Sequence, residues 1–246
     1  MMIIAAAQTI PVRENIQQNI SNHCKLIELA AAHKVQLLIF PELSLTGYER
    51  ENAERLSFTP DDPRLKDLQE LAVKYQMIVI AGAPIKLATG LHIGAFIISP
   101  DHTISFYTKQ FLHDGEEVSF VAGNLHNPQI TLEDESFSLA ICADLENPVH
   151  AENASKIQST GYLAGIFYTP NGITGGLDKL KGYAKQYSFN VLMSNFAGES
   201  YGIPSAGSSS FWSNKGELLA QLNSSEEGLV IAYKDKNEWA AQSIFK

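Results

Sequence analysis

The sequence LLIFPE at residues 37–42 decides the fold, because it is an unbroken apolar run that ends in a proline and then a carboxylate. A short apolar run closed by proline is typical of a buried strand. Most glutamates lie on a solvated surface, but Glu42 follows this run directly and is therefore expected close to the core. Burial would raise the pKa of its carboxyl, as a base that works near neutral pH requires, and Pro41 restricts the backbone that aims it.

Two further segments deliver a polar side chain from the end of an apolar strand. Residues 106–109 read FYTK and end in Lys109, whereas residues 139–144 read LAICAD and place Cys142 before a turn. Taken alone, a single cysteine is usually an inert core residue, and a lysine after a strand is often an edge residue. Together, however, a carboxylate, an ammonium and a thiol would supply the base, the oxyanion stabiliser and the nucleophile of an acyl transfer.

Apolar strands alternate with amphipathic helices along the chain, which is typical of a layered α/β protein. Sites gather where strands end at their carboxyl edge, so Glu42, Lys109 and Cys142 are expected to share one pocket. The helix predicted over residues 13–33 carries Cys24 on its apolar face, so this thiol is expected in the core. Further helices are predicted over residues 64–75, 150–160 and 177–188, and strands over residues 3–7, 37–40, 78–83, 95–99, 104–107, 137–141, 163–167, 191–195, 209–213 and 229–233.

Composition sets broader limits on the class of protein. The chain has 246 residues, 45% of them hydrophobic, and no linker-like stretch divides it, so residues 1–246 are expected to form one domain. A formal charge of -9 without a clustered basic face disfavours nucleic-acid binding. The two distant cysteines make no disulfide framework, and the first residues lack the basic lead and long apolar core expected of a secretory leader. No apolar run approaches the ~20 residues of a membrane span. These features favour a cytoplasmic protein with free thiols and no membrane span.

Rival chemistries lack their signatures in this sequence. There is no His-Glu-x-x-His, no paired Cys-x-x-Cys, no Gly-x-Gly-x-x-Gly after the first strand and no Walker loop, so the sequence predicts no metal and no cofactor. A cysteine–histidine pair would need a histidine, and His92, His113 and His150 are available. None of them sits in a recognisable local signature, and His113, the nearest competitor, is interpreted as a loop residue.

In this order, the segments resemble the nitrilase superfamily of carbon-nitrogen hydrolases over nearly the whole chain. The resemblance is carried by FPELSLTGY at residues 40–48, the Lys-x-x-Leu pattern that starts at Lys109, the Cys-x-Asp turn at residues 142–144 and SAGSSSFW at residues 205–212. It implies a four-layer α-β-β-α sandwich and a Glu42, Lys109 and Cys142 triad. Alignment on the neighbouring glycines selects Glu116 rather than Glu117 as a second acid, which would orient Lys109 and the substrate.

The function implied is hydrolysis of a small amide, with a nitrile or a carbamoyl compound as less favoured substrates. Cys142 would attack, Glu42 would move the protons, and Lys109 with the Ala143 N–H would stabilise the charged intermediate. Asp144 is interpreted as a turn or cap residue rather than a catalyst. Two alternatives stay open: an acyltransferase that uses the same thioester, and a catalytically silent binding or regulatory module.

Residues beside the predicted pocket provide weaker expectations about the substrate. Many relatives carry an arginine after the Cys-x-Asp turn, where this chain has Glu146. If that arginine binds a substrate carboxylate, Glu146 reverses the local charge and favours a neutral or amine-bearing amide over an acidic one. Four further residues could contact the substrate, namely Tyr48, Tyr168, Asn171 and Asn195.

The resemblance also implies a homodimer or a higher homo-oligomer. The last segment, residues 236–246, contains Trp239, Ile244 and Phe245. These apolar residues could pack on a neighbouring subunit or could equally cover their own subunit.

Overall fold

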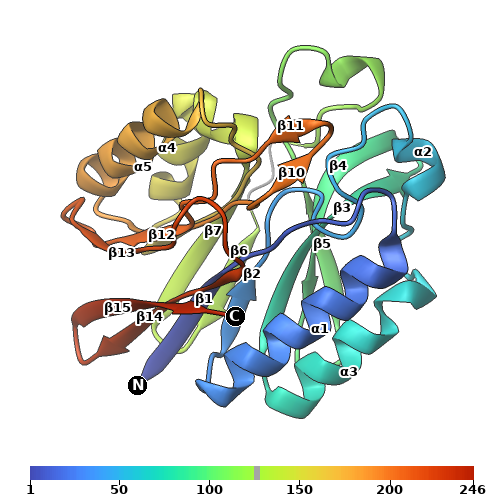
Figure 1. Ribbon diagram of the computed structural model, residues 1–246. Helices are drawn as coiled ribbons and strands as arrows, with labels where there is room; N and C mark the ends of the chain where they lie inside the picture. Colours follow the sequence, from blue (N-terminus) through green and yellow to red (C-terminus); the bar gives the residue numbers. More distant parts are fainter. Residues whose placement is uncertain (125–127) are drawn as a thin grey trace.

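The computed structural model describes residues 1–124 and 128–246, and within them two β-sheets lie face to face between two layers of helices (Figure 1). One sheet has seven strands, in the spatial order β15 (Glu238–Phe245), β14 (Gly228–Asp235), β1 (Met2–Gln8), β2 (Leu37–Ile39), β3 (Ile78–Leu87), β4 (Gly90–Ile98) and β5 (Ile104–Thr108). The other has six, in the order β13 (Leu218–Gln221), β12 (Ser210–Trp212), β9 (Asn190–Ser194), β8 (Gly161–Gly165), β7 (Glu135–Ile141) and β6 (Gln129–Leu132).

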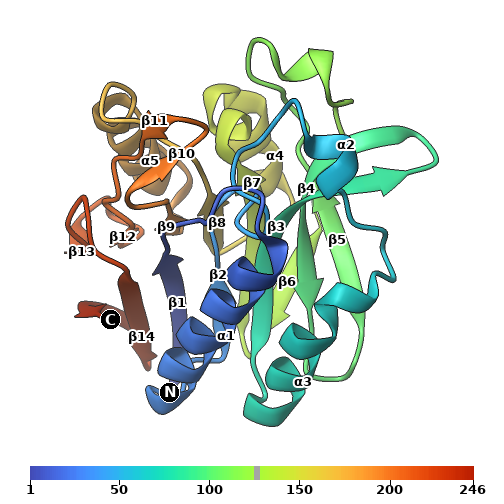
Figure 2. The same cartoon turned by 45° about the vertical axis from the view of Figure 1, so that its right-hand side comes forward.

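Helices cover the outer face of each sheet. Figure 2 shows α1 (Ile16–Ala32) and α3 (Lys66–Tyr75) side by side on the seven-stranded sheet, while α4 (Pro148–Lys156) and α5 (Ile173–Tyr187) lie beside the six-stranded one. The remaining elements are short: α2 (Ala53–Leu56), the 3-10 turns Pro63–Leu65, Glu116–Val118 and Cys142–Glu146, and the hairpin of β10 (Glu199–Ser200) and β11 (Ile203–Pro204). The α-β-β-α order confirms the predicted four-layer sandwich.

The alternation of side chains along β1 explains why this strand is apolar throughout. Ile3 and Ala5 pack in the cluster beneath α1 and α3, whereas Ile4 and Ala6 pack in the cluster between the sheets. A strand buried on both faces reads as a continuous apolar run, and β2 has the same character. In each sheet the central strands are parallel, β1-β2-β3 in one and β7-β8-β9 in the other.

Two helices, α1 and α4, begin directly after a capping asparagine and not at the residue that the sequence predicted. Asn15 accepts a hydrogen bond from the Gln18 N–H, so α1 starts at Ile16 and not at residue 13. Asn147 caps α4 in the same way ahead of Pro148, a residue suited to the first helical position. The predicted core position of Cys24 is corrected to a half-buried one at the edge of the helix cluster.

The C-terminal segment forms an edge strand of its own subunit. β15 pairs antiparallel with β14 along its whole length, and the Trp239 ring lies 5.3 Å from the Phe211 ring, between centroids. The segment therefore covers its own sheet, and association with a second copy stays a prediction.

Candidate active site

Glu42 lies in a turn between the two sheets, directly after β2. The Phe40 N–H donates to the Ile80 carbonyl, which continues the pairing with β3 up to the turn. A Cβ on Gly82 would lie 2.4 Å from the Leu43 nitrogen, so only glycine lets β3 pass this close to the turn. The result is a carboxylate that is 1% exposed at the end of a buried strand.

Lys109 joins Glu42 to a second buried acid. Its Nζ donates to Glu42 Oε1 at 2.7 Å and to both oxygens of Glu116 at 2.8 Å. Glu116 also accepts from the Tyr48 hydroxyl at 2.5 Å and from the His113 backbone N–H at 2.7 Å. Lys109 is itself fully buried and forms no part of the cavity wall described below.

Cys142 sits on a sharp turn from β7 into the 3-10 turn Cys142–Glu146. Its φ is +42°, a left-handed conformation that is uncommon for a residue with a side chain and that is often found at functional positions. The thiol donates to the Phe167 carbonyl at 3.8 Å. Cys142 is 9% exposed, and this small exposed surface faces the cavity that Glu42 also lines.

Asp144 fastens the cysteine turn to the segment that follows Lys109. Its Oδ1 accepts from the backbone N–H groups of Gln110 and Phe111, both at 2.9 Å. Its Oδ2 accepts from the Ile141 N–H at 2.9 Å and the Tyr107 hydroxyl at 2.7 Å. Asp144 is thus a structural residue, as the sequence suggested, but it is a clamp between two segments rather than a simple helix cap.

Burial and charge together set the protonation of this group. Burial raises the pKa of Glu42 to about 7, against the lowering effect of Lys109, and Glu116 raises it further. Burial also raises the pKa of the Cys142 thiol well above its usual range, and Glu42 adds to the effect. For Lys109, burial lowers the pKa, but Glu42, Cys142 and Glu116 outweigh it, so the ammonium stays charged. The resting site therefore combines a neutral thiol with a carboxyl that can take up a proton near neutral pH.

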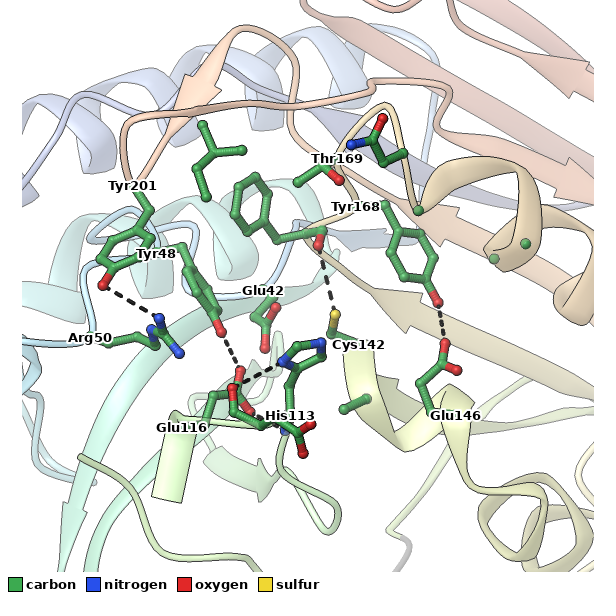
Figure 3. A pocket seen from close by; sticks show the side chains of 18 of the residues that line it. Glu42, Tyr48, Arg50, His113, Glu116, Cys142, Glu146, Tyr168, Thr169 and Tyr201 are labelled. Carbon is green, nitrogen blue, oxygen red and sulfur yellow. Dashed lines mark hydrogen bonds between the residues drawn. The ribbon is translucent and has the colours of Figure 1, made fainter. Parts of the chain in front are cut away.

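These groups open onto a cavity of about 660 Å³ (Figure 3). Acidic, basic and aromatic side chains line it. Its wall contains Glu42, Tyr48, Arg50, His113, Asp114, Glu116, Cys142, Ala143, Glu146, Phe167, Tyr168, Thr169, Asn171, Gly172, Gly175, Gly176, Lys179, Tyr201 and Ile203. A cavity of this size suits a small molecule.

The structure brings most of the predicted site residues to this cavity. Tyr48, Ala143, Glu146, Tyr168 and Asn171 line it. The hydroxyl of Tyr168 donates to Glu146 at 3.4 Å, and Lys179 forms an ion pair with the same carboxylate.

Asn195 is a correction to the sequence interpretation. It is fully buried and does not line the cavity. Its Oδ1 accepts from the Tyr168 N–H at 3.0 Å, and its Nδ2 donates to the Gly207 carbonyl at 2.8 Å. Its polar atoms are occupied in holding the loop that carries Tyr168, so it supports the wall without contacting a ligand.

Several wall residues were missed because no local pattern marks them. Arg50, Lys179 and Tyr201 come from a loop, a helix face and a hairpin that only the folded chain brings together. His113 does lie in a loop, as predicted, but that loop is part of the cavity wall.

In the part of the chain that the structure describes, no group of three or more His, Cys, Asp or Glu residues is arranged to hold a metal ion. No helix in residues 1–124 or 128–246 has the length and apolar character needed to cross a bilayer.

Comparisons with known proteins agree over nearly the whole chain. Residues 3–242 match the family described as carbon-nitrogen hydrolase. A nitrilase from Pyrococcus abyssi is 26% identical over 244 residues, which cover 96% of this chain and 90% of that protein. A protein N-terminal amidase from Schizosaccharomyces pombe is 27% identical over 161 residues, covering 60% of this chain and 56% of that protein. The solved structure of an amidase from Nesterenkonia sp. AN1 has the same fold, with a TM-score of 0.85, 21% identity, and coverage of 96% of this chain and 94% of that one. The chain therefore belongs to the carbon-nitrogen hydrolase family, in the nitrilase superfamily, and is a carbon–nitrogen hydrolase.

Proposed function

We propose that this hydrolase cleaves a small amide through a thioester on Cys142, with Glu42 as the general base and acid. The observation that carries the proposal is the state of the Glu42 carboxylate. Its Oε1 is held by Lys109, whereas its Oε2 is buried and has no hydrogen-bond partner among the described residues. A buried carboxylate oxygen without a donor, in a cavity shared with a thiol, is suited to accept the thiol proton.

In the first half of the proposed reaction, Glu42 removes the Cys142 proton as the sulfur attacks the amide carbon. A carbon–sulfur bond forms and the carbonyl electron pair moves to oxygen. When the carbonyl reforms, the carbon–nitrogen bond breaks, and the proton on Glu42 passes to the leaving ammonia.

In the second half, Glu42 removes a proton from water, which attacks the thioester carbon. The carbon–sulfur bond then breaks, the thiol is restored and the product is a carboxylic acid.

The charge balance of the buried group supports this order of events. Before attack, Glu42, Glu116 and Lys109 together carry one net negative charge. Proton transfer neutralises Glu42 at the moment when a negative charge appears on the substrate oxygen, so Lys109 then faces one carboxylate and the oxyanion. We assign the oxyanion to Lys109 and the Ala143 N–H, because a fixed cation in a dry site stabilises a developing anion strongly.

The relatives favour an amide among the possible substrates. The Nesterenkonia amidase, with the same fold, has been solved with butyramide bound to one of its mutants. The Schizosaccharomyces pombe relative is also an amidase, and the Pyrococcus abyssi relative is a nitrilase, so a nitrile is the second class to test.

The test measures ammonia release from a panel of amides, nitriles and carbamoyl compounds. Cys142→Ala should abolish turnover, and Glu42→Gln should lower kcat by about 10²–10⁴-fold, the usual contribution of a general acid–base. Cys24→Ala is the matched control, because this half-buried thiol lies in the helix layer and should leave turnover unchanged. A Cys142→Ala protein that still releases ammonia would refute the nucleophile assignment.

The same assay separates hydrolysis from acyl transfer. With an added amine, a hydrolase still gives mainly the carboxylic acid, whereas an acyltransferase gives the new amide. Formation of the new amide in preference to the acid would replace the proposed hydrolysis by transfer.

A further inference from the structure

Arg50 lies in the cavity wall and differs from the other arginines in having no direct ion pair with a carboxylate of the described residues. The three other arginines of the chain, Arg13, Arg55 and Arg64, each form an ion pair with a carboxylate. No carboxylate among the described residues lies within ion-pair distance of Arg50, and its Nε is buried without a hydrogen-bond partner in that part of the chain. Guanidinium groups removed from water normally have an anion or several acceptors nearby.

Aromatic rings hold the Arg50 guanidinium in place at the cavity. Its central carbon lies 4.9 Å from the centre of the Tyr201 ring and 5.7 Å from that of Tyr48. Its Nη2 donates to the Tyr201 hydroxyl at 3.4 Å, and that hydroxyl donates in turn to the Glu51 carboxylate. A Cβ on Gly115 would lie 3.1 Å from Nη1, so the absence of a side chain there leaves room for the guanidinium. The cation is thus oriented by the two rings, and it interacts with Glu51 electrostatically and through the Tyr201 hydroxyl but without a direct ion pair.

Glu146, another acid of the cavity wall, already has a cationic partner. Figure 3 shows Glu146 on the far side of Cys142 from Arg50. The Glu146 carboxylate is paired with Lys179 and accepts from the Tyr168 hydroxyl. The sequence interpretation expected the negative charge of Glu146 to repel an acidic substrate. Because Lys179 balances the Glu146 charge, this repulsion is no longer expected. Arg50 remains as the unpaired cation of the wall.

From these observations we infer that Arg50 binds a carboxylate at the end of the substrate remote from the scissile amide. The inference rests on the proposed amide hydrolysis and narrows its substrate class to monoamides of dicarboxylic acids. A planar guanidinium offers two parallel N–H groups that match the two oxygens of a carboxylate. The chemistry of the site thus selects an amide with a negatively charged tail over one with a neutral or a positively charged tail.

The test compares three amides that differ only in the tail: succinamate, butyramide and β-alaninamide, which end in a carboxylate, a methyl group and an ammonium. The wild type should prefer succinamate in kcat/KM. The ratio of kcat/KM for succinamate to that for butyramide should fall by about 10- to 100-fold in Arg50→Gln, the range for a hydrogen-bonded charge pair, and mainly through KM. Arg50→Lys keeps the charge but not the fork and should lose part of the preference.

Arg55→Gln is the matched control, since Arg55 is an exposed arginine outside the cavity wall and should leave the ratio unchanged. A second arm measures binding directly by calorimetry in the Cys142→Ala background. Succinamate should bind more tightly than butyramide there, and adding Arg50→Gln should remove the difference.

The outcomes separate the two proposals. Preference for butyramide or β-alaninamide over succinamate, or an unchanged ratio in Arg50→Gln, overturns the role of Arg50 while amide hydrolysis stands. Arg50-dependent binding of succinamate without ammonia release by the wild type overturns the proposed hydrolysis and supports the carboxylate site. The carboxylate-tailed amides can also be tested as a homologous series of longer chains. If none of them is bound or hydrolysed, the carboxylate-binding role of Arg50 is overturned.

Discussion

Asp144→Asn is the perturbation that the structure defines most closely. The carboxylate is fully buried and accepts four hydrogen bonds, three from backbone N–H groups and one from the Tyr107 hydroxyl. An asparagine has the same shape but only one acceptor oxygen. If that oxygen keeps the Gln110 and Phe111 N–H groups, the amide nitrogen must face the Ile141 N–H, and two donors then oppose each other.

The cost follows from these contacts. A buried N–H left without an acceptor costs about 1–3 kcal/mol, and the bonds that remain lose the contribution of a charged acceptor. We expect Asp144→Asn to lower the free energy of unfolding by about 2–5 kcal/mol, measured by urea denaturation. Because the clamp joins the Cys142 turn to the segment after Lys109, kcat should also fall in the fraction that remains folded.

Asp61→Asn is the matched control, because Asp61 is exposed and lies outside the cavity wall, and it should change neither quantity. Tyr107→Phe removes one donor from Asp144 and also the hydroxyl that lies 2.9 Å from His150 Nε2. Because the three backbone N–H groups still have Asp144 as their acceptor, Tyr107→Phe should lower the free energy of unfolding less than Asp144→Asn does. The reasoning fails if Asp144→Asn unfolds with the wild-type midpoint, or if it is destabilised but turns over substrate at the wild-type kcat.

Three further predictions concern titration and close packing. Burial raises the pKa of Glu42 to about 7, and the base must be ionised to act. As pH falls, kcat/KM should therefore decline with an apparent pKa near 7. A kcat/KM that stays constant down to about pH 5 would contradict the role of Glu42 as the base. Burial lowers the pKa of His23 from 6.5 to about 4, so the unfolded chain binds more protons in this range. The contribution of His23 to the free energy of unfolding should therefore be fully present above pH 6.5 and should be lost as pH falls from 6.5 to about 4, by about 3 kcal/mol in all. His23→Gln should remove this part of the pH dependence. Gly82→Ala should destabilise the protein by more than about 2 kcal/mol and lower kcat, because the new Cβ would meet the Leu43 nitrogen at 2.4 Å in the turn that carries Glu42. Gly182→Ala, in α5 with no heavy atom within 4 Å of the new Cβ, should instead be neutral or stabilising by up to about 1 kcal/mol in thermal unfolding, and equal effects of the two substitutions would refute the packing argument.

Strands that are buried on both faces were predictable, whereas of the four edge strands of the two large sheets only β5 was predicted. All ten predicted strands are present, because runs such as residues 37–40 and 137–141 are apolar and short. β6, β13 and β15 were missed because they lie at or next to the sheet edges, where only alternate side chains are buried or none is. In β15 the alternation of half-buried and exposed residues is present in EWAAQSIF, so a period-two count could have found it.

Some features of the site could likewise be predicted from local sequence, whereas others depend on tertiary contacts. Glu42, Lys109 and Cys142 each follow an apolar strand, so their positions could be read from the sequence. The pairing of Glu146 with Lys179 joins residues 33 apart in the sequence and depends on how α5 packs beside the cysteine turn. Similarly, no pattern in the sequence distinguishes Arg50 from the three paired arginines, because Gly115 and Tyr201, which lie beside its guanidinium, come from distant segments.

The second acid, Glu116, has an electrostatic consequence that a simple triad would lack. A buried carboxylate beside a single ammonium forms a neutral pair, in which the carboxylate stays ionised and is a weak base. Here Lys109 is shared between two carboxylates, and the charge of Glu116 is among the causes that raise the pKa of Glu42. The Glu116 oxygens accept hydrogen bonds from Lys109, Tyr48 and the His113 N–H, whereas Glu42 Oε2 has no such donor among the described residues. The excess negative charge of the buried group is therefore relieved most easily by protonation of Glu42, and in the proposed reaction the thiol of Cys142 is the source of that proton.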